Sequence, residues 1–238
     1  AFELPYIFSD DATAECVLDG RLVPELRAEI LEKGLGIRLM TVGNTGGWRD
    51  FATTARPIRG PADLKGLKIR TTPAPMEQEF VRKLGANPTP IAFSELYLAL
   101  ATGVVEGTKN SVQDIVSMKL NEHLKRLTLD RHAYMGALWW MSDKRWRALP
   151  PDIQALVAEG FEALKTTTRR VPKEKEMAAL EAFRASGGDI IVPDAEEKRA
   201  FVAAASPMRA WYRAKYGDAW LVKLDAAIAS CGGGATDR

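Results

Sequence analysis

The chain predicts an α/β fold with a substantially parallel sheet, and three observations support this prediction. Segments with period-two patterning alternate with segments in which apolar residues recur about every 3.6 positions. Alternating strands and helices are typical of a sheet whose strands run mostly parallel. The composition is globular, with 46% hydrophobic residues, and the 238-residue sequence contains no repeat and no low-complexity tract.

The first elements predicted along the chain are a helix, a strand and a turn. Apolar residues recur at helical spacing over 11–33, which predicts one helix that Gly34 ends. The segment 37–42 predicts a strand, and the glycine-rich segment 43–47 predicts a turn after it. The chain therefore opens on a helix, without the strand–helix pairs with which an α/β lobe normally begins.

The middle of the chain predicts shorter elements. Alternating patterns predict strands over 67–71 and 104–110. A helix is predicted to begin at 72–75, because proline suits the first helical turn, where the amide has no partner. Ser94 is the predicted N-cap of a further helix over 95–102.

The last part of the chain is predicted to be mainly helical. The segment 124–141 is extended and rich in aromatic residues, and the longest helix covers 150–186. Pro172 is expected to kink or break that helix, because proline removes a hydrogen bond and clashes with the preceding turn. Two more helices are predicted over 196–216 and 218–230.

The charge pattern argues against a nucleic-acid-binding protein. The 33 basic and 31 acidic residues give a net charge of +2 and are interspersed, and the densest basic stretches, 144–147 and 168–170, favour solvated helix faces. No apolar run reaches the roughly 18 residues that a membrane span needs, so no membrane insertion is predicted. Ala1 leads directly into a segment that resembles folded structure, so this chain is expected to lack a signal peptide.

The residues that usually carry catalysis or metal binding are sparse. His123 and His132 have no second histidine or cysteine at ligand spacing, so we expect no metal, and a structural role for His132. No nucleophile elbow and no phosphate-binding glycine loop occurs, so neither an enzyme nor a cofactor is predicted. Cys16 and Cys231 lie near opposite ends; a disulfide is possible, and two independent thiols are the favoured interpretation.

Arg70 is the strongest candidate for ligand binding from the residues alone. It closes the predicted strand 67–71, and ligands of open α/β sheets lie beyond the carboxyl ends of the strands. The planar guanidinium can donate two parallel, charge-assisted hydrogen bonds to a carboxylate. The alternative for an arginine at a strand end is an ordinary surface ion pair.

Several motifs in this order resemble one family. The segments 57–70 (Pro-Ile … Ala-Asp-Leu-Lys-Gly-Leu-Lys-Ile-Arg), 88–100, 104–110, 4–8 (Leu-Pro-Tyr-Ile-Phe) and 149–151 are similar to those of solute-binding proteins of tripartite ATP-independent periplasmic (TRAP) transporters. The resemblance covers nearly the whole chain. It implies a two-lobed, class II-like periplasmic-binding-protein fold with cross-lobe strands and a long helix spanning both lobes.

The resemblance also implies a domain organisation. Lobe I is expected to comprise 1–46 and 136–175 and to be incomplete at its N-terminus, since family members carry further strand–helix units before the Leu-Pro-x-x-Phe segment. Lobe II is expected to comprise 47–135 and 176–238.

The resemblance implies ligand-binding roles for five residues. Arg70 is similar to the arginine that pairs with the ligand carboxylate, and Arg49 resembles a second arginine of the cleft. Phe93 resembles the aromatic residue that packs on the ligand, and Asn110 the asparagine that bonds the carboxylate. Trp139, in the predicted cross-lobe strand, is a candidate wall of the pocket, with core packing as the alternative.

The sequence departs from the family pattern beside Asn110. Lys109 stands where the family usually has an acid, Ser111 where it has a proline, and Glu106 where aspartate is commoner. Two interpretations of Lys109 stay open: it adds positive potential to the site, or it points away into solvent.

The function implied is that of a periplasmic subunit that captures a small organic acid and delivers it to the membrane subunits of a TRAP transporter. The expected partners are therefore a carboxylate ligand and those subunits. A sensory or regulatory ligand-binding module on the same fold is the alternative. A third reading, a small-acid lyase, requires an acid–base pair in the cleft.

Overall fold

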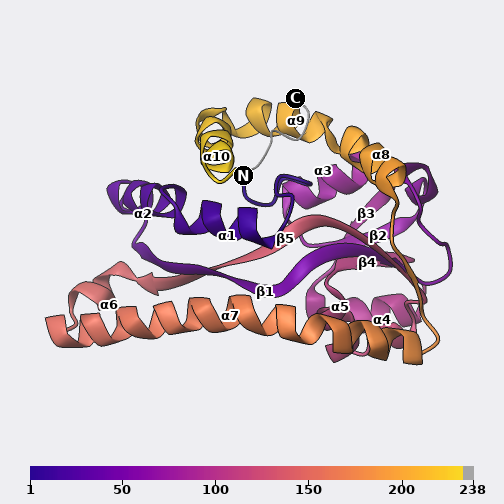
Figure 1. Ribbon diagram of the computed structural model, residues 1–238, viewed down its shortest axis with the longest axis horizontal. Coiled ribbons are helices and arrows are strands. Elements are labelled where there is room, and N and C mark those ends of the chain that lie inside the picture. Colours follow the sequence, from indigo (N-terminus) through magenta and orange to yellow (C-terminus); the bar gives the residue numbers. More distant parts are fainter. Residues whose placement is uncertain (233–238) are drawn as a thin grey trace.

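A mixed six-stranded sheet organises the protein, which a computed structural model describes over residues 1–232 (Figure 1). The strands are β1 (Ile37–Thr53), β2 (Lys68–Thr71), β3 (Asn87–Pro90), β4 (Gly107–Asn110), β5 (Arg126–Ser142) and β6 (Asp189–Ile191). Their order is β3-β2-β4-β1-β5-β6. The predicted α/β class is confirmed.

The predicted predominance of parallel pairing is wrong for the longest strands. β2 is parallel to β3 and β4, and β5 is parallel to β6. β1, however, pairs antiparallel with both β4 and β5. The reason is that β1 and β5, at 17 residues each, run side by side in opposite directions along the molecule instead of being joined by a helical crossover.

The glycine-rich segment 43–47 lies inside β1 and does not form the predicted turn. The side chain of Asn44 accepts hydrogen bonds from the amides of Gly46 and Gly47 at 2.8 and 2.6 Å. The register with β5 shifts between Asn44 and Trp48, so the extra residues are absorbed as a bulge. β1 and β5 consequently continue along most of the length of the molecule (Figure 1).

Ten α-helices and three short 3₁₀ turns surround the sheet within the described residues. The helices are α1 (Asp11–Asp19), α2 (Leu22–Glu32), α3 (Pro75–Lys83), α4 (Leu96–Ala101), α5 (Val112–Ser117), α6 (Asp143–Arg147), α7 (Pro151–Ala185), α8 (Ala195–Ala205), α9 (Pro207–Tyr216) and α10 (Ala219–Ser230). The 3₁₀ turns are η1 (Pro61–Leu64), η2 (Phe93–Glu95) and η3 (Leu120–Glu122).

Two predicted helices are each divided into two. The helix expected over 11–33 stops at Gly20, which takes an extended conformation at the end of α1. The helix expected over 196–216 is divided before Pro207, because proline has no amide to continue α8 and instead begins α9. The apolar periodicity predicted one helix in place of each pair, because both helices of a pair bury the same kind of apolar face.

The predicted break at Pro172 and the predicted cap at Ser94 are both wrong. α7 continues through Pro172 without a break; the ring is buried, and the side-chain amide of Gln113 on α5 donates to the carbonyl of Pro172. Packing of α5 and β1 along α7 therefore outweighs the lost helical hydrogen bond. Ser94 does not cap a helix, because it lies within η2 and α4 begins at Leu96.

The hydrophobic core lies on both faces of the sheet. Adjacent residues of β1 point to opposite faces, so Phe51 joins one apolar cluster and Ala52 the other. The first cluster is covered by α1, α2, α3, α8, α9 and α10, and the second by α4, α5 and the last part of α7 (Figure 1). The boundaries expected between the lobes, after residues 46, 135 and 175, fall inside β1, β5 and α7 respectively.

Cys16 and Cys231 form a disulfide, so the interpretation as two independent thiols is wrong. The pair joins α1 to the residue that follows α10, 215 positions later. Packing of α10 on α1 and α2 brings the two ends of the chain together, which the sequence separation conceals.

Candidate functional site

β2, β3 and β4 run parallel, so their carboxyl ends lie at the same edge of the sheet. β4 pairs with β1 at that edge. β2 and β4 lie side by side, with Ile69 opposite Gly107, and β4 pairs with β1 so that Asn110 lies opposite Asp50. This register brings Arg70 near the end of β2 and Asn110 at the end of β4 to the same edge as Arg49 on β1. Sequence positions separated by up to 61 residues are therefore assembled by strand order alone.

Arg70 is held from one side and has no acidic partner within the described part of the chain. Its Nε donates to the carbonyl of Ile91 at 2.9 Å, and its guanidinium carbon lies 5.6 Å from the ring centroid of Phe93. Within residues 1–232, no ion pair or hydrogen bond engages its two terminal amino groups. The residue is 3% exposed, and burial lowers the pKa of its guanidinium, an effect that Glu77 opposes and Arg49 reinforces.

Phe93 is the exposed member of this pair. It follows β3 in the turn η2 and is 36% exposed, while its ring covers one face of Arg70. A planar cation under an exposed aromatic ring keeps its in-plane donors free, because the ring interacts with the face of the guanidinium and not with its N–H bonds.

Asn110 is part of a local hydrogen-bond chain at the start of α5. Its amide oxygen accepts from the hydroxyl of Thr108 at 2.7 Å, and its amide nitrogen donates to the carboxylate of Asp114 at 3.3 Å. Ser111 caps α5 by accepting from the amide of Asp114 at 3.1 Å. Ser111, where the resemblance implies a proline, thus fixes the backbone of Asp114, whose carboxylate contacts Asn110.

Lys109 points neither into solvent nor freely into the site. Its ammonium lies 2.7 Å from the carboxylate of Glu77 on α3, and it is 3% exposed. Burial lowers the pKa of Lys109 to about 8, although Glu77 acts to raise it. Burial also acts to raise the pKa of Glu77, but Lys109 and Arg49 lower it to about 2, so the carboxylate is ionised at neutral pH.

Glu77 is the residue that the sequence analysis missed. Its carboxylate accepts from the amide of Thr72 at 3.0 Å and also lies 3.8 Å from Arg49, whose Nη1 donates to the carbonyl of Lys109 at 3.3 Å. A signal was present, because Glu77 lies three positions before the core residue Phe80 on an amphipathic helix. An acid on that face needs a buried partner.

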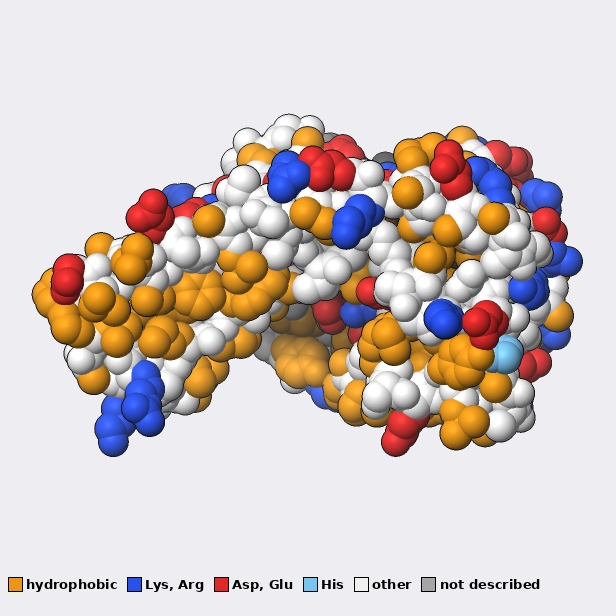
Figure 2. Space-filling model, turned by 90° about the horizontal axis from the view of Figure 1, so that it is seen from below, with side chains coloured by type: hydrophobic (Ala, Val, Ile, Leu, Met, Phe, Trp, Pro, Cys, Tyr) orange, Lys and Arg blue, Asp and Glu red, His pale blue; other side chains and the backbone are white. Residues whose placement is uncertain are grey.

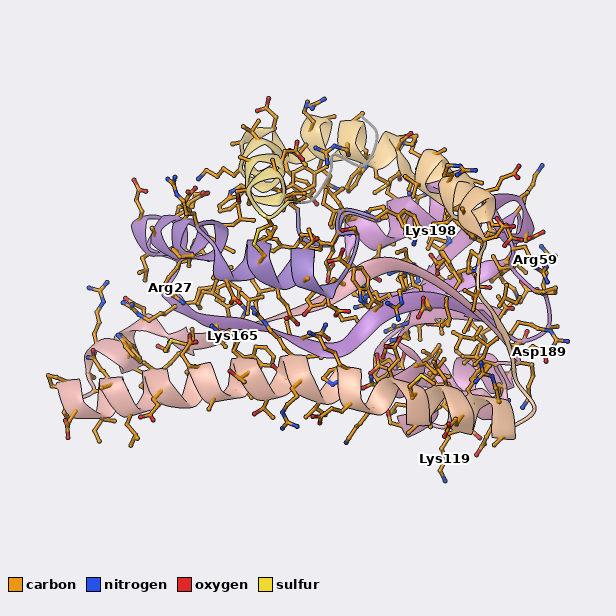
Figure 3. The ribbon with its side chains drawn as sticks, in the orientation of Figure 1. Arg27, Arg59, Lys119, Lys165, Asp189 and Lys198 are labelled. Carbon is orange, nitrogen blue, oxygen red and sulfur yellow. A yellow bond between two sulfur atoms is a disulfide. The ribbon has the colours of Figure 1, made fainter. Side chains whose placement is uncertain are left out.

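A second buried polar cluster lies directly behind this site. His132 Nδ1 and the hydroxyl of Tyr6 both contact the carboxylate of Asp130, at 2.9 and 2.7 Å. Lys198 extends from α8 toward β5, where its ammonium donates to the carbonyl of Asp130 and lies 4.6 Å from the ring centroid of Tyr6 (Figure 3). Burial lowers the pKa of His132, which supports the expected structural role of a neutral imidazole.

Two cavities border these clusters. An open groove of about 750 Å³ lies between α5 and α7 beside the β1 bulge, and Asp114 is one of its walls. A small cavity of about 10 Å³ lies behind the site; its lining includes Arg49, Glu77, Lys109 and His132. Viewed from the side of α7, the molecule is hollowed between its two ends, with acidic and basic side chains inside the hollow (Figure 2).

The structure does not bring Trp139 to the other four predicted residues. Arg49 lies opposite Ala133 on β5, and Trp139 is six residues further along the strand, roughly 20 Å away at 3.3 Å per residue. Trp139 is half-buried and packs against Gly43 of β1. Its role in the same pocket stays a prediction.

The described residues contain no arrangement typical of metal binding or membrane insertion. Over 1–232, no three His, Cys, Asp or Glu side chains are grouped so that they could bind a metal. None of the helices in that part of the chain is both long enough and apolar enough to cross a bilayer. The groups that the site does offer are the guanidinium groups of Arg49 and Arg70 and the side-chain amide of Asn110, at one edge of the sheet.

Comparison with known proteins identifies the family. The family model for bacterial extracellular solute-binding proteins, family 7, matches residues 1–215. A solute-binding protein of Verminephrobacter eiseniae is 34% identical over 226 residues, which are 94% of this chain and 66% of that protein. The 2,3-diketo-L-gulonate-binding periplasmic protein of Escherichia coli is 30% identical over 79% of this chain and 57% of its own length. The chain thus spans about three fifths to two thirds of these relatives.

A solved structure agrees with this assignment. The TRAP periplasmic solute-binding protein of Anaerococcus prevotii, with bound D-glucuronate, superimposes with a TM-score of 0.88 at 27% identity, covering 97% of this chain and 73% of that one. The match confirms the two-lobed α/β architecture that the motifs imply. The chain belongs to family 7 of the bacterial extracellular solute-binding proteins.

Proposed function

We propose that this protein is the periplasmic solute-binding subunit of a TRAP transporter, and that it captures a small organic acid by its carboxylate and delivers it to membrane subunits. The observation that carries the proposal is the guanidinium of Arg70: a buried cation at the carboxyl edge of the sheet with no acidic partner among the described residues. A buried charge is costly unless it is paired, so this cation favours an anionic ligand.

The proposed contacts follow from the donors at this edge. Arg70 binds the carboxylate through its terminal amino groups, with Phe93 against the ligand and over the cation. Asn110 and Arg49 add donors from β4 and β1. Trp139 would contribute from the far part of β5, as a wall for a larger ligand.

Closure of two lobes would strengthen these contacts. Excluding water from a cleft raises the strength of every charge-assisted hydrogen bond inside it. We propose that 1–46 with 136–175 forms one lobe and 47–135 with 176–238 the other, of which 233–238 lie outside the described residues. β1, β5 and α7 pass from one proposed lobe to the other and would absorb a rotation, while the Cys16–Cys231 bond also links the two. The ligand can favour the closed form only by binding it more tightly than the open form.

The proposed location agrees with the disulfide, and the proposed role requires no catalysis. The Cys16–Cys231 bond is typical of an oxidising compartment such as the periplasm. The matching family is one of transport proteins, and binding and release of an unchanged solute needs no acid–base pair.

The experiment is calorimetric titration of the complete protein with a panel of acids: D-glucuronate, 2,3-diketo-L-gulonate, succinate and pyruvate. We expect at least one to bind, and Arg70→Ala to weaken its binding by about 2–5 kcal/mol, the cost of truncating one partner of a buried charge pair. Arg70→Lys keeps the charge but loses the planar fork, and should still weaken binding at least about tenfold.

Arg49→Ala serves as the comparison. It should weaken binding less than Arg70→Ala, because Arg49 already interacts with Glu77 and the carbonyl of Lys109. Equal affinity of Arg70→Ala and the wild type for every acid in the panel would contradict the proposal. A larger loss of affinity for Arg49→Ala than for Arg70→Ala would show that Arg49, and not Arg70, is the main partner of the carboxylate.

A further inference from the structure

The second cleft arginine, Arg49, has its guanidinium held by two groups outside its own strand. Its Nη1 donates to the backbone carbonyl of Lys109 at 3.3 Å, and its Nη2 lies 3.8 Å from the carboxylate of Glu77. The side chain is only 14% exposed, so its conformation depends on these neighbours more than on solvent. Whatever fixes the two groups therefore fixes Arg49.

Glu77 and Lys109 fix one another. The carboxylate–ammonium distance is 2.7 Å, and the same carboxylate also accepts from the amide of Thr72 at 3.0 Å. Both side chains are at most 8% exposed. Lys109 therefore has its charge neutralised within the protein, and it is Arg49, not Lys109, that can direct a free donor at a ligand.

The carboxylate and the ammonium come from different elements. Glu77 lies on α3, the helix that follows β2, whereas Lys109 lies on β4. The ion pair therefore joins α3 to a strand of the candidate site, at the point where Arg49 contacts both residues.

We propose that Glu77 is a positioning residue for ligand binding: together with Lys109 it holds the guanidinium of Arg49 in the orientation that meets the ligand. This inference rests on the proposed function, because it assigns a role within the same site. Losing Glu77 would release Arg49 and leave the Lys109 ammonium buried without a counter-ion, which favours its neutral form. The net charge of the pair would then stay near zero, so the effect on binding would come from geometry and not from added charge.

Among the described acids near the Glu77–Lys109 pair, Glu77 is the one that contacts Arg49. Glu3 and His132 line the same small cavity. Asp114 acts on the charge of Arg70, as Glu77 and Arg49 do. Within the described residues, neither Glu3 nor Asp114 forms an ion pair with Arg49. Glu77 is therefore the carboxylate whose removal tests the idea.

The test is a double-mutant cycle on the complete protein, measured by calorimetry with the acid of the panel above that binds most tightly. Glu77→Gln should weaken binding about tenfold, a typical cost of removing a group that orients a binding residue. The same substitution in an Arg49→Ala background should change affinity by less than about twofold, because the residue to be positioned is gone. Additive losses in the double variant would overturn the proposal.

A matched control and a rescue sharpen the result. Glu79→Gln removes a carboxylate from the same helix that pairs with Arg82 and Lys83 instead, and it should leave affinity within about twofold. Glu77→Gln combined with Lys109→Glu places the carboxylate on β4 instead of α3, and recovery of affinity there supports the proposal.

A crystal structure of Glu77→Gln without ligand gives a readout that is independent of the proposed function. We expect the Arg49 guanidinium to leave the carbonyl of Lys109, and an unchanged Arg49 would overturn the inference. If no acid of the panel binds the wild type, the proposed function fails, while this structure still decides whether Glu77 positions Arg49.

Discussion

Asp50 on β1 and Asp130 on β5 each accept a hydrogen bond from the backbone of the other's strand. The amide of Arg131 donates to Asp50 at 2.8 Å, and the amide of Phe51 donates to Asp130 at 3.0 Å. The two carboxyls thus replace ladder hydrogen bonds at the register shift between Arg49 and Phe51. Both carboxyls are buried. The pairing of β1 with β5 next to the candidate site therefore depends on two acids that are shielded from water.

The first prediction concerns the protonation of Asp50. Burial, and then the charge of Asp130, raise the pKa of Asp50 well above its ordinary value. An acid whose folded pKa is raised contributes stability that is complete below its unfolded pKa, about 4, and is lost as pH rises through the folded pKa. Asp50→Asn keeps the acceptor oxygen and removes the titration. Between pH 5 and pH 8, the free energy of unfolding of Asp50→Asn in urea should therefore rise by about 1 kcal/mol or more relative to that of the wild type.

Asp143→Asn is the control for this experiment. Burial acts to raise the pKa of Asp143, but Arg38 and Arg147 lower it, so its titration lies below that pH range. The free energy of unfolding of this variant should differ from that of the wild type by a constant amount from pH 5 to pH 8. A constant difference for Asp50→Asn as well would show that Asp50 is ionised in the folded protein.

The second prediction concerns the disulfide. Cys16 and Cys231 close nearly the whole chain into a loop, and cross-links of long loops stabilise mainly by restricting the unfolded state. Reduction with dithiothreitol should lower the free energy of unfolding by about 2–4 kcal/mol in urea titrations followed by tryptophan fluorescence. The double variant Cys16→Ser/Cys231→Ser should match the reduced protein and be insensitive to the reductant. An unchanged midpoint on reduction would mean that the bond adds no net stability.

The third prediction tests the packing of the central strand β4. A methyl group at Gly107 would lie 2.6 Å from the carbonyl oxygen of Ala52 and 2.9 Å from Ile69, contacts that require the backbone to shift. Gly107→Ala should therefore destabilise the fold by about 1–3 kcal/mol, the usual cost of overpacking. Gly136→Ala on β5 is the matched control, because among the described residues, apart from its two chain neighbours, no atom lies within 4 Å of the added methyl. Similar unfolding midpoints for the two variants would contradict the register of β4 against β1 and β2.

The fourth prediction concerns the aromatic cover of Arg70. Phe93→Leu keeps an apolar side chain but removes the ring that lies 5.6 Å from the guanidinium carbon. A cation–π contact is worth about 0.5–1 kcal/mol at an exposed site, so affinity for the bound acid should fall about two- to fivefold in calorimetry. Tyr97→Leu, four residues further on and in contact with His123, should leave the affinity unchanged. Equal effects at both positions would assign Phe93 to general packing.

Local sequence determined most elements and the strand ends at which the candidate residues Arg70 and Asn110 lie. The strand that ends near Arg70 and the helix after Asn110 are local features, because alternation and capping act between near neighbours. The motif order was sufficient to recognise the family before any geometry was known. Where local patterns failed, as at Gly20, Pro172 and Pro207, the error was in the ends or the continuity of a helix and not in its existence.

Only the tertiary structure decided which distant residues meet. The antiparallel pairing of β1 with β5, the bond between Cys16 and Cys231, and the Glu77–Lys109 ion pair each join positions that no local pattern connects. The physical reason is that burial and charge pairing depend on distances in space, whereas periodicity reports only which face of an element is apolar. A lysine at position 109 therefore left two interpretations open until α3 supplied the carboxylate that neutralises it.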